Sequence, residues 1–286
     1  LPPMPDAAEP PRLRFARWLV SRDNPLTPRV TVNRMWQEFF GQGLVESSAD
    51  FGIKGERPTH PALLDWLAAE FVIQKWDVKK MHKLIVMSAT YRQSSKTRKE
   101  IETRDPYNKW IARQSRLRLS SELVRDNALA ASGLLDLTVG GKSIRPLIPK
   151  GVMDLGFRDF VKWKESEGSS RYRRGLYILF QRTIPYPQLM NFDAPNSLLA
   201  CSRRERSTTP LQALNLLNDP VFFEAAQGLA TRVLRETSAS LNERIRYAFE
   251  LCLARSPKPG ELERLVRFYE EQKEYLRRNA EAAEGL

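Results

Sequence analysis

Runs of apolar residues at helical spacing, each introduced by a helix-capping residue, recur along most of this sequence. Asp77 precedes one such run. Thr209-Pro210 precedes another, and Gln212 three residues after the threonine completes the pattern of a capping box. Thr27-Pro28 has the same form and predicts a further helix start. Because amphipathic helices bury their apolar faces by packing on one another, the pattern predicts a mainly α, multi-helix globular fold.

Two stretches depart from this helical pattern. Residues 138–175 combine basic residues with glycines and prolines and show no sustained period, so we expect a loop-rich basic excursion there. Residues 175–182 are rich in β-forming side chains and predict one small β element. The chain has 286 residues, of which 42% are apolar, which is enough for a sizeable core. We therefore interpret residues 1–286 as a single helical domain.

The charge balance is strongly basic. Lys and Arg number 46 against 34 Asp and Glu, a formal net charge of +12. Such a surplus favours anionic partners, which include nucleic acid, an anionic glycan and an acidic neighbouring domain. It is also compatible with a solvated basic surface that has no specific partner. No apolar run approaches the roughly 20 residues that a membrane span needs, so we expect no such span.

Few residues are available for metal binding or nucleophilic catalysis. The two cysteines, Cys201 and Cys252, are too few for a cysteine-based zinc site, and we expect free, buried thiols. The two histidines, His60 and His82, exclude a site of several histidines, and a catalytic triad would have to use one of them. We expect His60 to form hydrogen bonds at a helix terminus. The sequence predicts no metal site and no cofactor in this chain.

Three arginines before a helix start form the sharpest candidate site. Arg203, Arg204 and Arg206 precede the Thr209 cap, and the first turn of a helix offers free N–H groups and partial positive charge to an anion. Forked guanidinium donors would add to this attraction. We call these four residues the anion corner. The alternative is structural, because the same arginines could form ion pairs inside the protein.

A second polar set lies elsewhere in the sequence. It consists of Asn33, Arg34, Asp50, His60 and Asp193. An enzyme could use Asp50 and Asp193 as general acid and base. Nothing in the sequence brings these two carboxylates together, so the set stays a hypothesis.

Several ordered blocks stand out along the chain: Phe15–Leu19, Asn24–Thr27, Val32–Trp36, Ala49–Gly52, Pro58–Ala68, Ser88–Ser94, Tyr172–Tyr177, Phe192–Pro195, Arg203–Arg206 and Thr209–Leu214. Together they resemble the C-terminal domain of unknown function in large planctomycete-type proteins that also carry a cytochrome-c-like domain. The resemblance implies a piece of a longer, exported, extracytoplasmic protein, and it implies no mechanism. The haem of the companion domain has no attachment motif here, since Cys-x-x-Cys-His is absent.

These observations favour a non-enzymatic interaction module of a multidomain exported protein, with a basic surface that faces an anionic partner. The expected partners are sister domains of the same polypeptide and an anionic polymer. One alternative is a hydrolase that acts on an anionic glycan. Another is a nucleic-acid-binding module, which is disfavoured because no helix-turn-helix or zinc-finger pattern is present and export would separate the chain from the genome.

Overall fold

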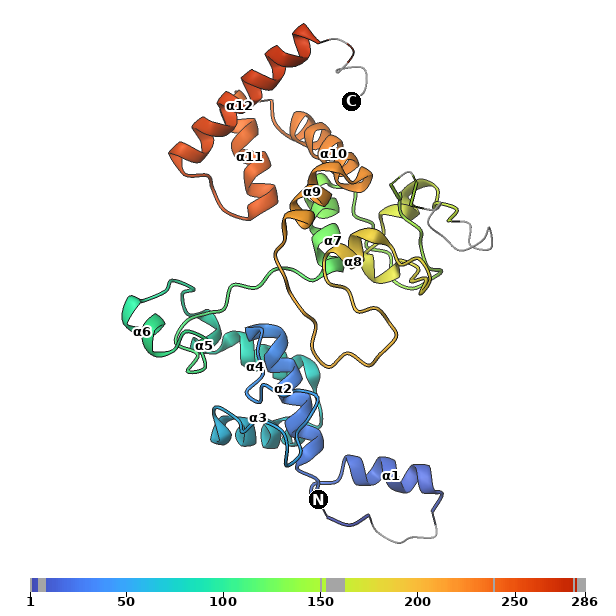
Figure 1. The fold of residues 1–286 in the computed structure, drawn as a ribbon, viewed down its shortest axis with the longest axis vertical. Helices are drawn as coiled ribbons and strands as arrows, with labels where there is room; N and C mark the ends of the chain where they lie inside the picture. Colours follow the sequence, from blue (N-terminus) through green and yellow to red (C-terminus); the bar gives the residue numbers. More distant parts are fainter. Residues whose placement is uncertain are drawn as a thin grey trace. The chain divides into compact units, whose positions relative to one another are not determined.

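The computed structural model describes residues 2–4, 9–149, 151–152, 163–238, 240–279 and 281. The chain divides into two compact units, which are treated separately below. Unit 1 comprises residues 1–118 and 200–204, and unit 2 comprises residues 119–199 and 205–286. The interpretation of residues 1–286 as one domain stays a prediction. The mainly α fold is confirmed, since twelve α-helices lie in the described part of the chain (Figure 1).

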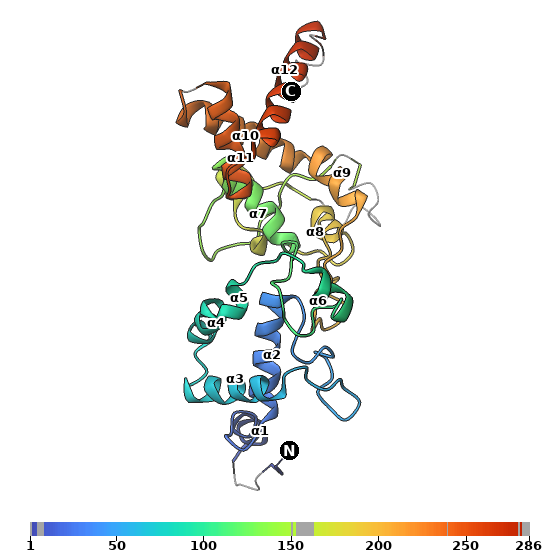
Figure 2. The ribbon, with the colours of Figure 1, turned by 90° about the vertical axis from the view of Figure 1, so that its left-hand side faces the viewer.

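Unit 1 contains the first six helices. They are α1 (Pro11–Leu19), α2 (Leu26–Phe40), α3 (Pro61–Ile73), α4 (Val78–Met87), α5 (Ala89–Arg92) and α6 (Lys99–Arg104). Helix α3 crosses α2, as Figures 1 and 2 show, and this crossing holds most of the core. The buried core side chains are Val32, Trp36, Phe40, Leu44, Val45, Leu64, Leu67, Ala68, Phe71, Met81 and Ile85.

Aromatic rings fasten the centre of unit 1. Trp36 stacks on Phe40 with ring centroids 4.1 Å apart. Tyr91 meets Phe39 and Phe40 edge-on at 5.7 and 6.0 Å. The ring of Tyr91 therefore holds α5, to which it belongs, against α2.

Two amides on α2 hold the loop that follows this helix. The buried side chain of Asn33 donates to the carbonyl of Val45 (3.0 Å) and accepts from its N–H (2.8 Å). One turn later, the amide of Gln37 accepts a hydrogen bond from the hydroxyl of Ser48. A β-carbon on Gly43 would lie 2.5 Å from the Asn33 amide nitrogen, so glycine is needed where the loop approaches the helix.

The helix starts partly agree with the sequence pattern. Asp77 caps α4 by accepting from the N–H of Lys80 at 3.0 Å, as predicted. The start predicted at Thr27-Pro28 is wrong, because α2 begins at Leu26 and Thr27 lies inside it. The side chain of Asn24 accepts from the N–H of Leu26 at 3.1 Å and thereby supplies the hydrogen bond expected of Thr27.

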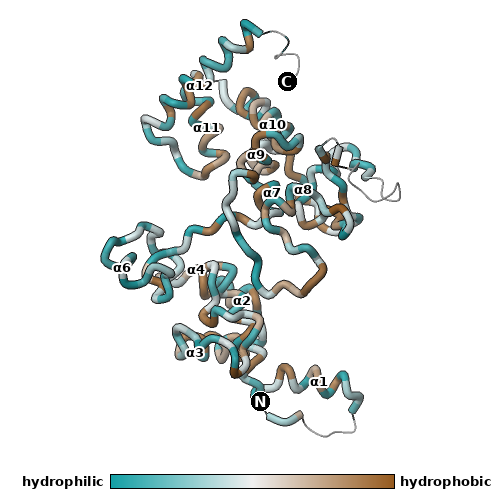
Figure 3. The backbone as a smooth tube through the Cα atoms, viewed as in Figure 1, coloured by the Kyte–Doolittle hydropathy of each residue, from teal (hydrophilic) through white to brown (hydrophobic). Residues whose placement is uncertain are grey.

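Unit 2 contains the remaining helices around a central pair. Helix α10 packs on α7, and α8 and α9 pack beside them, while α11 and α12 form a hairpin (Figure 1). Helix α12 is mostly hydrophilic, with hydrophobic residues at intervals along it (Figure 3). The elements are α7 (Ser121–Ser132), the 3₁₀ turns η2 (Gly168–Tyr172) and η3 (Gly175–Tyr177), α8 (Pro187–Asn191), α9 (Pro210–Asn218), α10 (Pro220–Glu236), α11 (Leu241–Leu253) and α12 (Pro259–Arg278).

The β element predicted near residues 175–182 is reduced to isolated pairing. Residues 175–177 form η3, and Ile178 pairs with Ile144 in a one-residue parallel bridge. A second bridge joins Asp136 to Arg173. The N–H of Gly175 donates to the Asp126 carboxylate on α7 at 2.6 Å, so this segment is held against a helix rather than a neighbouring strand. Part of the predicted basic excursion, residues 150 and 153–162, lies outside the described residues.

A buried arginine joins α7 to the chain that carries η2 and η3. The Arg125 side chain is 1% exposed and donates to the carbonyls of Arg173 (2.8 Å) and Arg171 (2.6 Å). The Asp126 carboxylate lies 3.9 Å from its guanidinium. Burial lowers the pKa of Arg125, and nearby Tyr186 and Asp126 oppose that shift. The guanidinium thus supplies these two carbonyls with the hydrogen-bond donors that a neighbouring strand would supply in a sheet.

The capping box predicted for α9 is confirmed. The Thr209 hydroxyl accepts from the N–H of Gln212 at 3.3 Å, and the Gln212 side chain accepts from the N–H of Thr209 at 3.3 Å. We expect Thr209→Ala to lower the free energy of unfolding by about 1 kcal/mol, since one capping bond is lost. Thr209→Ser keeps the hydroxyl and should cost far less. Chemical denaturation of both variants measures this, and equal losses would assign the effect to the methyl group instead.

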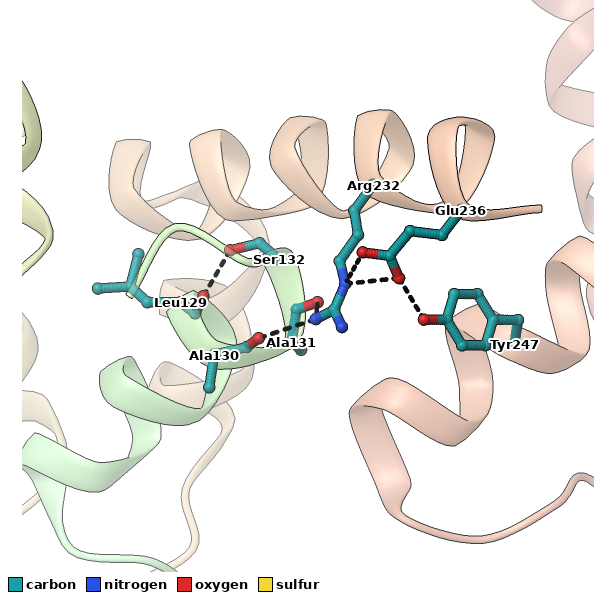
Figure 4. A network of polar contacts seen from close by, with 7 residues as sticks. All are labelled: Leu129, Ala130, Ala131, Ser132, Arg232, Glu236 and Tyr247. Carbon is teal, nitrogen blue, oxygen red and sulfur yellow. Dashed lines mark hydrogen bonds and ion pairs between the residues drawn. The ribbon is translucent and has the colours of Figure 1, made fainter. Parts of the chain in front are cut away.

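A polar junction on Arg232 connects three helices of unit 2 (Figure 4). Its guanidinium donates to the carbonyls of Ala130 (3.1 Å) and Ala131 (2.9 Å) at the end of α7, and to Glu236 one turn later on α10 (3.1 Å). The Tyr247 hydroxyl on α11 also donates to Glu236. Positive charge at a helix C-terminus is favourable, so Arg232 stabilises α7 while it holds Glu236 in place.

This junction predicts acid sensitivity. Hydrogen bonds from Tyr247 and Arg232 lower the pKa of Glu236 below its ordinary value of 4.5. A lowered folded-state pKa stabilises the fold above the ordinary value, and this stabilisation is lost as the pH falls through the folded-state pKa. We therefore expect the melting temperature of the native protein to exceed that of Glu236→Gln at neutral pH, and the gap to close on acidification. Tyr247→Phe removes one of the hydrogen bonds to Glu236, so the difference in melting temperature caused by Glu236→Gln should be smaller in that background. A difference in melting temperature that does not change with pH would contradict the prediction.

Candidate polyanion-binding surface

The positive charge of the chain is concentrated in unit 1. Unit 1 contains 23 Lys and Arg against 13 Asp and Glu, a net charge of +10. Unit 2 contains 23 against 21, a net charge of +2. Because non-specific attraction of a polyanion follows the local excess of charge, unit 1 is the better candidate for an anionic partner.

Within unit 1, most of the excess lies in residues 75–118, which we call the basic segment. It holds 13 Lys and Arg against 4 Asp and Glu. It covers α4, α5, α6 and the irregular chain after α6, and the chain around α6 is predominantly hydrophilic (Figure 3). Its exposed cations are Lys75, Lys79, Lys80, Lys83, Arg92, Lys96, Arg98, Lys99, Arg104, Lys109 and Arg116. The backbone N–H of Lys80 is the main cause that lowers the pKa of the Asp77 carboxyl in this segment.

The chain after α6 forms two consecutive turns that display aromatic rings. We call residues 105–111 the aromatic turn. Tyr107 and Trp110 are 77% and 54% exposed, although such large aromatic side chains are on average more buried. The Arg104 guanidinium lies 5.7 Å from the centroid of the Trp110 ring. Lys109 lies between the rings in sequence, with its ammonium 3.4 Å from the Glu46 carboxylate.

A buried carboxylate fixes this turn. Asp105 is 6% exposed and accepts from the backbone N–H groups of Lys109 (2.8 Å) and Trp110 (2.7 Å). The same residue is the C-cap of α6, where its N–H donates to the carbonyl of Ile101 at 2.7 Å, so Asp105 joins the end of this helix to the turn. The carboxylate holds the backbone of Trp110 and leaves its ring in solvent.

The aromatic turn also has an uncommon backbone. Asn108 and Ile111 adopt positive φ angles of 53° and 54°. Asparagine tolerates this region, whereas a β-branched residue there costs about 1–3 kcal/mol. Ile111 packs against the core of unit 1, and its N–H donates to the carbonyl of Asn108 at 3.1 Å, which offsets that cost. Packing of Ile111 and this hydrogen bond therefore stabilise the turn conformation in which the two aromatic rings are exposed.

An apolar groove lies on another part of unit 1. It has a volume of about 580 Å³ and is floored by Trp36, Leu67 and Ile85. Trp66 and Met87 line it and are 51% and 60% exposed. Lys80 and Lys83 of the basic segment stand among its lining residues. A groove of this size can receive apolar groups of a partner.

The residues of the predicted anion corner are divided between the units. Arg203 and Arg204 belong to unit 1, and Arg206 and Thr209 belong to unit 2. Arg203 and Arg204 are exposed, and Arg206 is partly buried. Arg204 and Arg206 already interact with other residues of the chain. The corner stays a prediction, and the structural role of these arginines stays open beside it.

The second polar set is likewise divided. Asn33, Arg34, Asp50 and His60 belong to unit 1, whereas Asp193 belongs to unit 2. Asn33 is buried and its side chain is hydrogen-bonded to the backbone of Val45, whereas Arg34 is exposed. Asp50 accepts from the N–H of Gly52 at 2.7 Å, and Asp193 accepts from the N–H and hydroxyl of Ser207 at 2.8 and 2.9 Å. The ring of His60, just before α3, has Nδ1 3.0 Å from the Thr59 hydroxyl.

The cysteines differ from expectation in one respect. Cys201 and Cys252 are free thiols, as predicted, but both are exposed, so the expected burial is wrong. The Sγ of Cys201 donates to the carbonyl of Arg203 at 3.1 Å. Among the residues that the structure describes, no group of three or more His, Cys, Asp or Glu side chains is placed to hold a metal ion. No described helix has the length and apolar character of a membrane span.

Sequence reasoning missed the basic segment and the aromatic turn. Counting charges by segment would have found the first, because residues 75–118 stand out in the sequence alone. The second gives no comparable signal, since Tyr107 and Trp110 could equally pack in a core. Their exposure follows from the hydrogen bonds of Asp105, which depend on the folded backbone.

Comparison with known proteins places the chain in a family. The model of PSD1, described as a protein of unknown function (DUF1553), matches residues 11–269. No match was found among curated proteins or solved structures. The matched range includes the core of unit 1, the basic segment and most of unit 2. The resemblance to a domain of unknown function is thereby confirmed, and the chain belongs to the PSD1 family of proteins of unknown function.

Proposed function

We propose that this chain is a non-enzymatic interaction module of a multidomain, extracytoplasmic protein, and that unit 1 binds an anionic polymer through the basic segment. The observation that carries the proposal is the concentration of charge. Unit 1 has a net charge of +10 of the total +12, and its basic segment combines 13 cationic with 4 acidic residues. A charge excess of this density raises the local concentration of a polyanion before any specific contact forms.

Two further features support binding rather than catalysis. The cations of the basic segment are exposed instead of converging in a closed pocket. The carboxylates Asp50 and Asp193, which would serve an acid–base mechanism, each accept hydrogen bonds from their own loop neighbours. The export of the protein and its sister-domain partners rest on the family resemblance and belong to the proposal.

Heparin chromatography tests the proposal. We expect the triple variant Lys79→Ala, Lys83→Ala and Lys96→Ala to elute at lower salt than the native protein, because fewer counterions are released on binding. The matched control is Arg235→Ala, Arg267→Ala and Arg277→Ala, which removes three exposed cations from α10 and α12 of unit 2. This control should elute close to the native protein. If both triple variants elute at equally lowered salt concentrations, binding depends on the net charge of the protein and not on the basic segment.

The same column separates the two roles of the anion corner. Arg203→Ala, Arg204→Ala and Arg206→Ala should each elute at lower salt if these arginines contact the polymer. If they support the fold instead, the melting temperature should fall while retention stays unchanged. Retention unchanged in all three variants would remove the corner from the binding surface and leave the basic segment as the site.

A further inference from the structure

The aromatic turn combines features that a purely electrostatic surface does not need. Tyr107 and Trp110 expose large aromatic faces beside cations, and neighbouring exposed apolar groups rimmed by charge can mark a binding site. Asp105 fixes the backbone of Lys109 and Trp110 from within, and Asn108 and Ile111 hold left-handed conformations. A solvated basic surface requires none of these. The backbone that carries the rings is therefore ordered before any partner arrives, which reduces the entropy lost on binding.

We propose that the aromatic turn is a stacking platform for the sugar rings of an acidic polysaccharide. This rests on the proposed function and specifies its ligand. A pyranose ring has an apolar C–H face that stacks on an aromatic ring, and its carboxylate or sulfate groups lie at the ring edge. Trp110 and Tyr107 supply the faces. Arg98 and Arg104 supply the charges. Arg98 is anchored to the carbonyl of Ala112 at 3.1 Å beside the turn, and the guanidinium of Arg104 lies 5.7 Å from the centroid of the Trp110 ring.

The shape of the site does not separate a sugar from a nucleobase. The cavity that Tyr107 lines holds only about 30 Å³, so either ring would stack on the exposed outer face of an aromatic side chain. We choose the sugar because the extracytoplasmic location in the proposed function would separate the chain from nucleic acid. The nucleobase is therefore kept as an outcome of the test.

Titrations of the full chain with three probes test the assignment. Heparin offers sugar rings and charge, inorganic polyphosphate offers charge without rings, and oligothymidylate offers charge with bases. We expect Trp110→Ala and Tyr107→Ala each to raise the Kd for heparin about tenfold and to leave its salt dependence unchanged, because stacking releases no counterions. The Kd for polyphosphate should not change. Trp110→Phe keeps an aromatic face and should retain most of the affinity.

The matched control replaces two aromatic residues of comparable exposure on α12, Phe268→Ala and Tyr275→Ala, which should bind heparin as the native protein does. Circular dichroism checks that each variant is folded. If the native protein does not bind heparin, both the proposed function and the stacking platform are wrong. Native protein that binds heparin equally well without Tyr107 and Trp110 would overturn the platform alone. A loss confined to oligothymidylate would assign the rings to nucleic acid.

Discussion

Replacing the buried Arg125 by methionine should lower the free energy of unfolding of unit 2 by about 3–5 kcal/mol, the range seen when one partner of a buried charge network is removed. The variant leaves the carbonyls of Arg171 and Arg173 without their donors. It also leaves the Asp126 carboxylate without its nearest positive charge. Chemical denaturation followed by circular dichroism measures the loss.

A lysine at position 125 distinguishes charge from geometry. It keeps the positive charge, but a single ammonium cannot reproduce the fork that reaches two carbonyls. We therefore expect Arg125→Lys to recover only part of the stability. The exposed Arg235 provides the control, and Arg235→Ala should change stability by no more than about 0.5 kcal/mol. If Arg125→Met lowers the free energy of unfolding by no more than this control does, water takes over the hydrogen bonds of the guanidinium.

Asn33→Leu should have the second largest effect, in unit 1. The two side chains have similar size, but leucine can neither donate nor accept a hydrogen bond. The substitution therefore removes the hydrogen bonds that the Asn33 amide makes to the carbonyl and the N–H of Val45. Each buried polar group left unpaired costs about 1–3 kcal/mol, so we expect a total loss of roughly 2–5 kcal/mol.

The neighbouring residue provides the control for this substitution. Arg34 is on the same helix and exposed, so Arg34→Ala should leave the stability nearly unchanged. Asn33→Asp keeps one acceptor and places a negative charge against the Val45 carbonyl, and it should also destabilise. Unchanged melting in Asn33→Leu would mean that the loop from residue 41 to residue 50 detaches without cost.

Local signals were predictable from the sequence and long-range ones were not. The capping box at Thr209 and the cap at Asp77 involve residues three positions apart, so their pattern is complete within a few letters of sequence. The segment after Gly175 has β-forming residues, but its neighbour in space is α7, whose Glu122 backbone would lie 3.0 Å from a β-carbon at Gly175. Packing on this helix overrides the strand propensity.

The candidate site shows the same division. The basic surplus was predictable from composition, whereas its place in the fold required the division into units. The anion corner was inferred from adjacency in sequence, but its arginines belong to two different units. The exposure of Trp110 depends on Asp105, five positions away and buried, and such a contact has no period or motif that the sequence displays.

The two left-handed residues of the aromatic turn set different limits on how this sequence can diverge. A glycine at position 108 would satisfy the backbone, since glycine adopts a positive φ at no steric cost, but it would lose the hydrogen bonds of the Asn108 side chain to the carbonyl (2.8 Å) and N–H (3.3 Å) of Arg113. A glycine at position 111 would relieve the backbone but remove an apolar side chain from the core of unit 1. Relatives that keep the two rings should therefore retain asparagine at position 108, which tolerates the positive φ and also holds Arg113, and should exchange Ile111 only when the core beneath it changes as well.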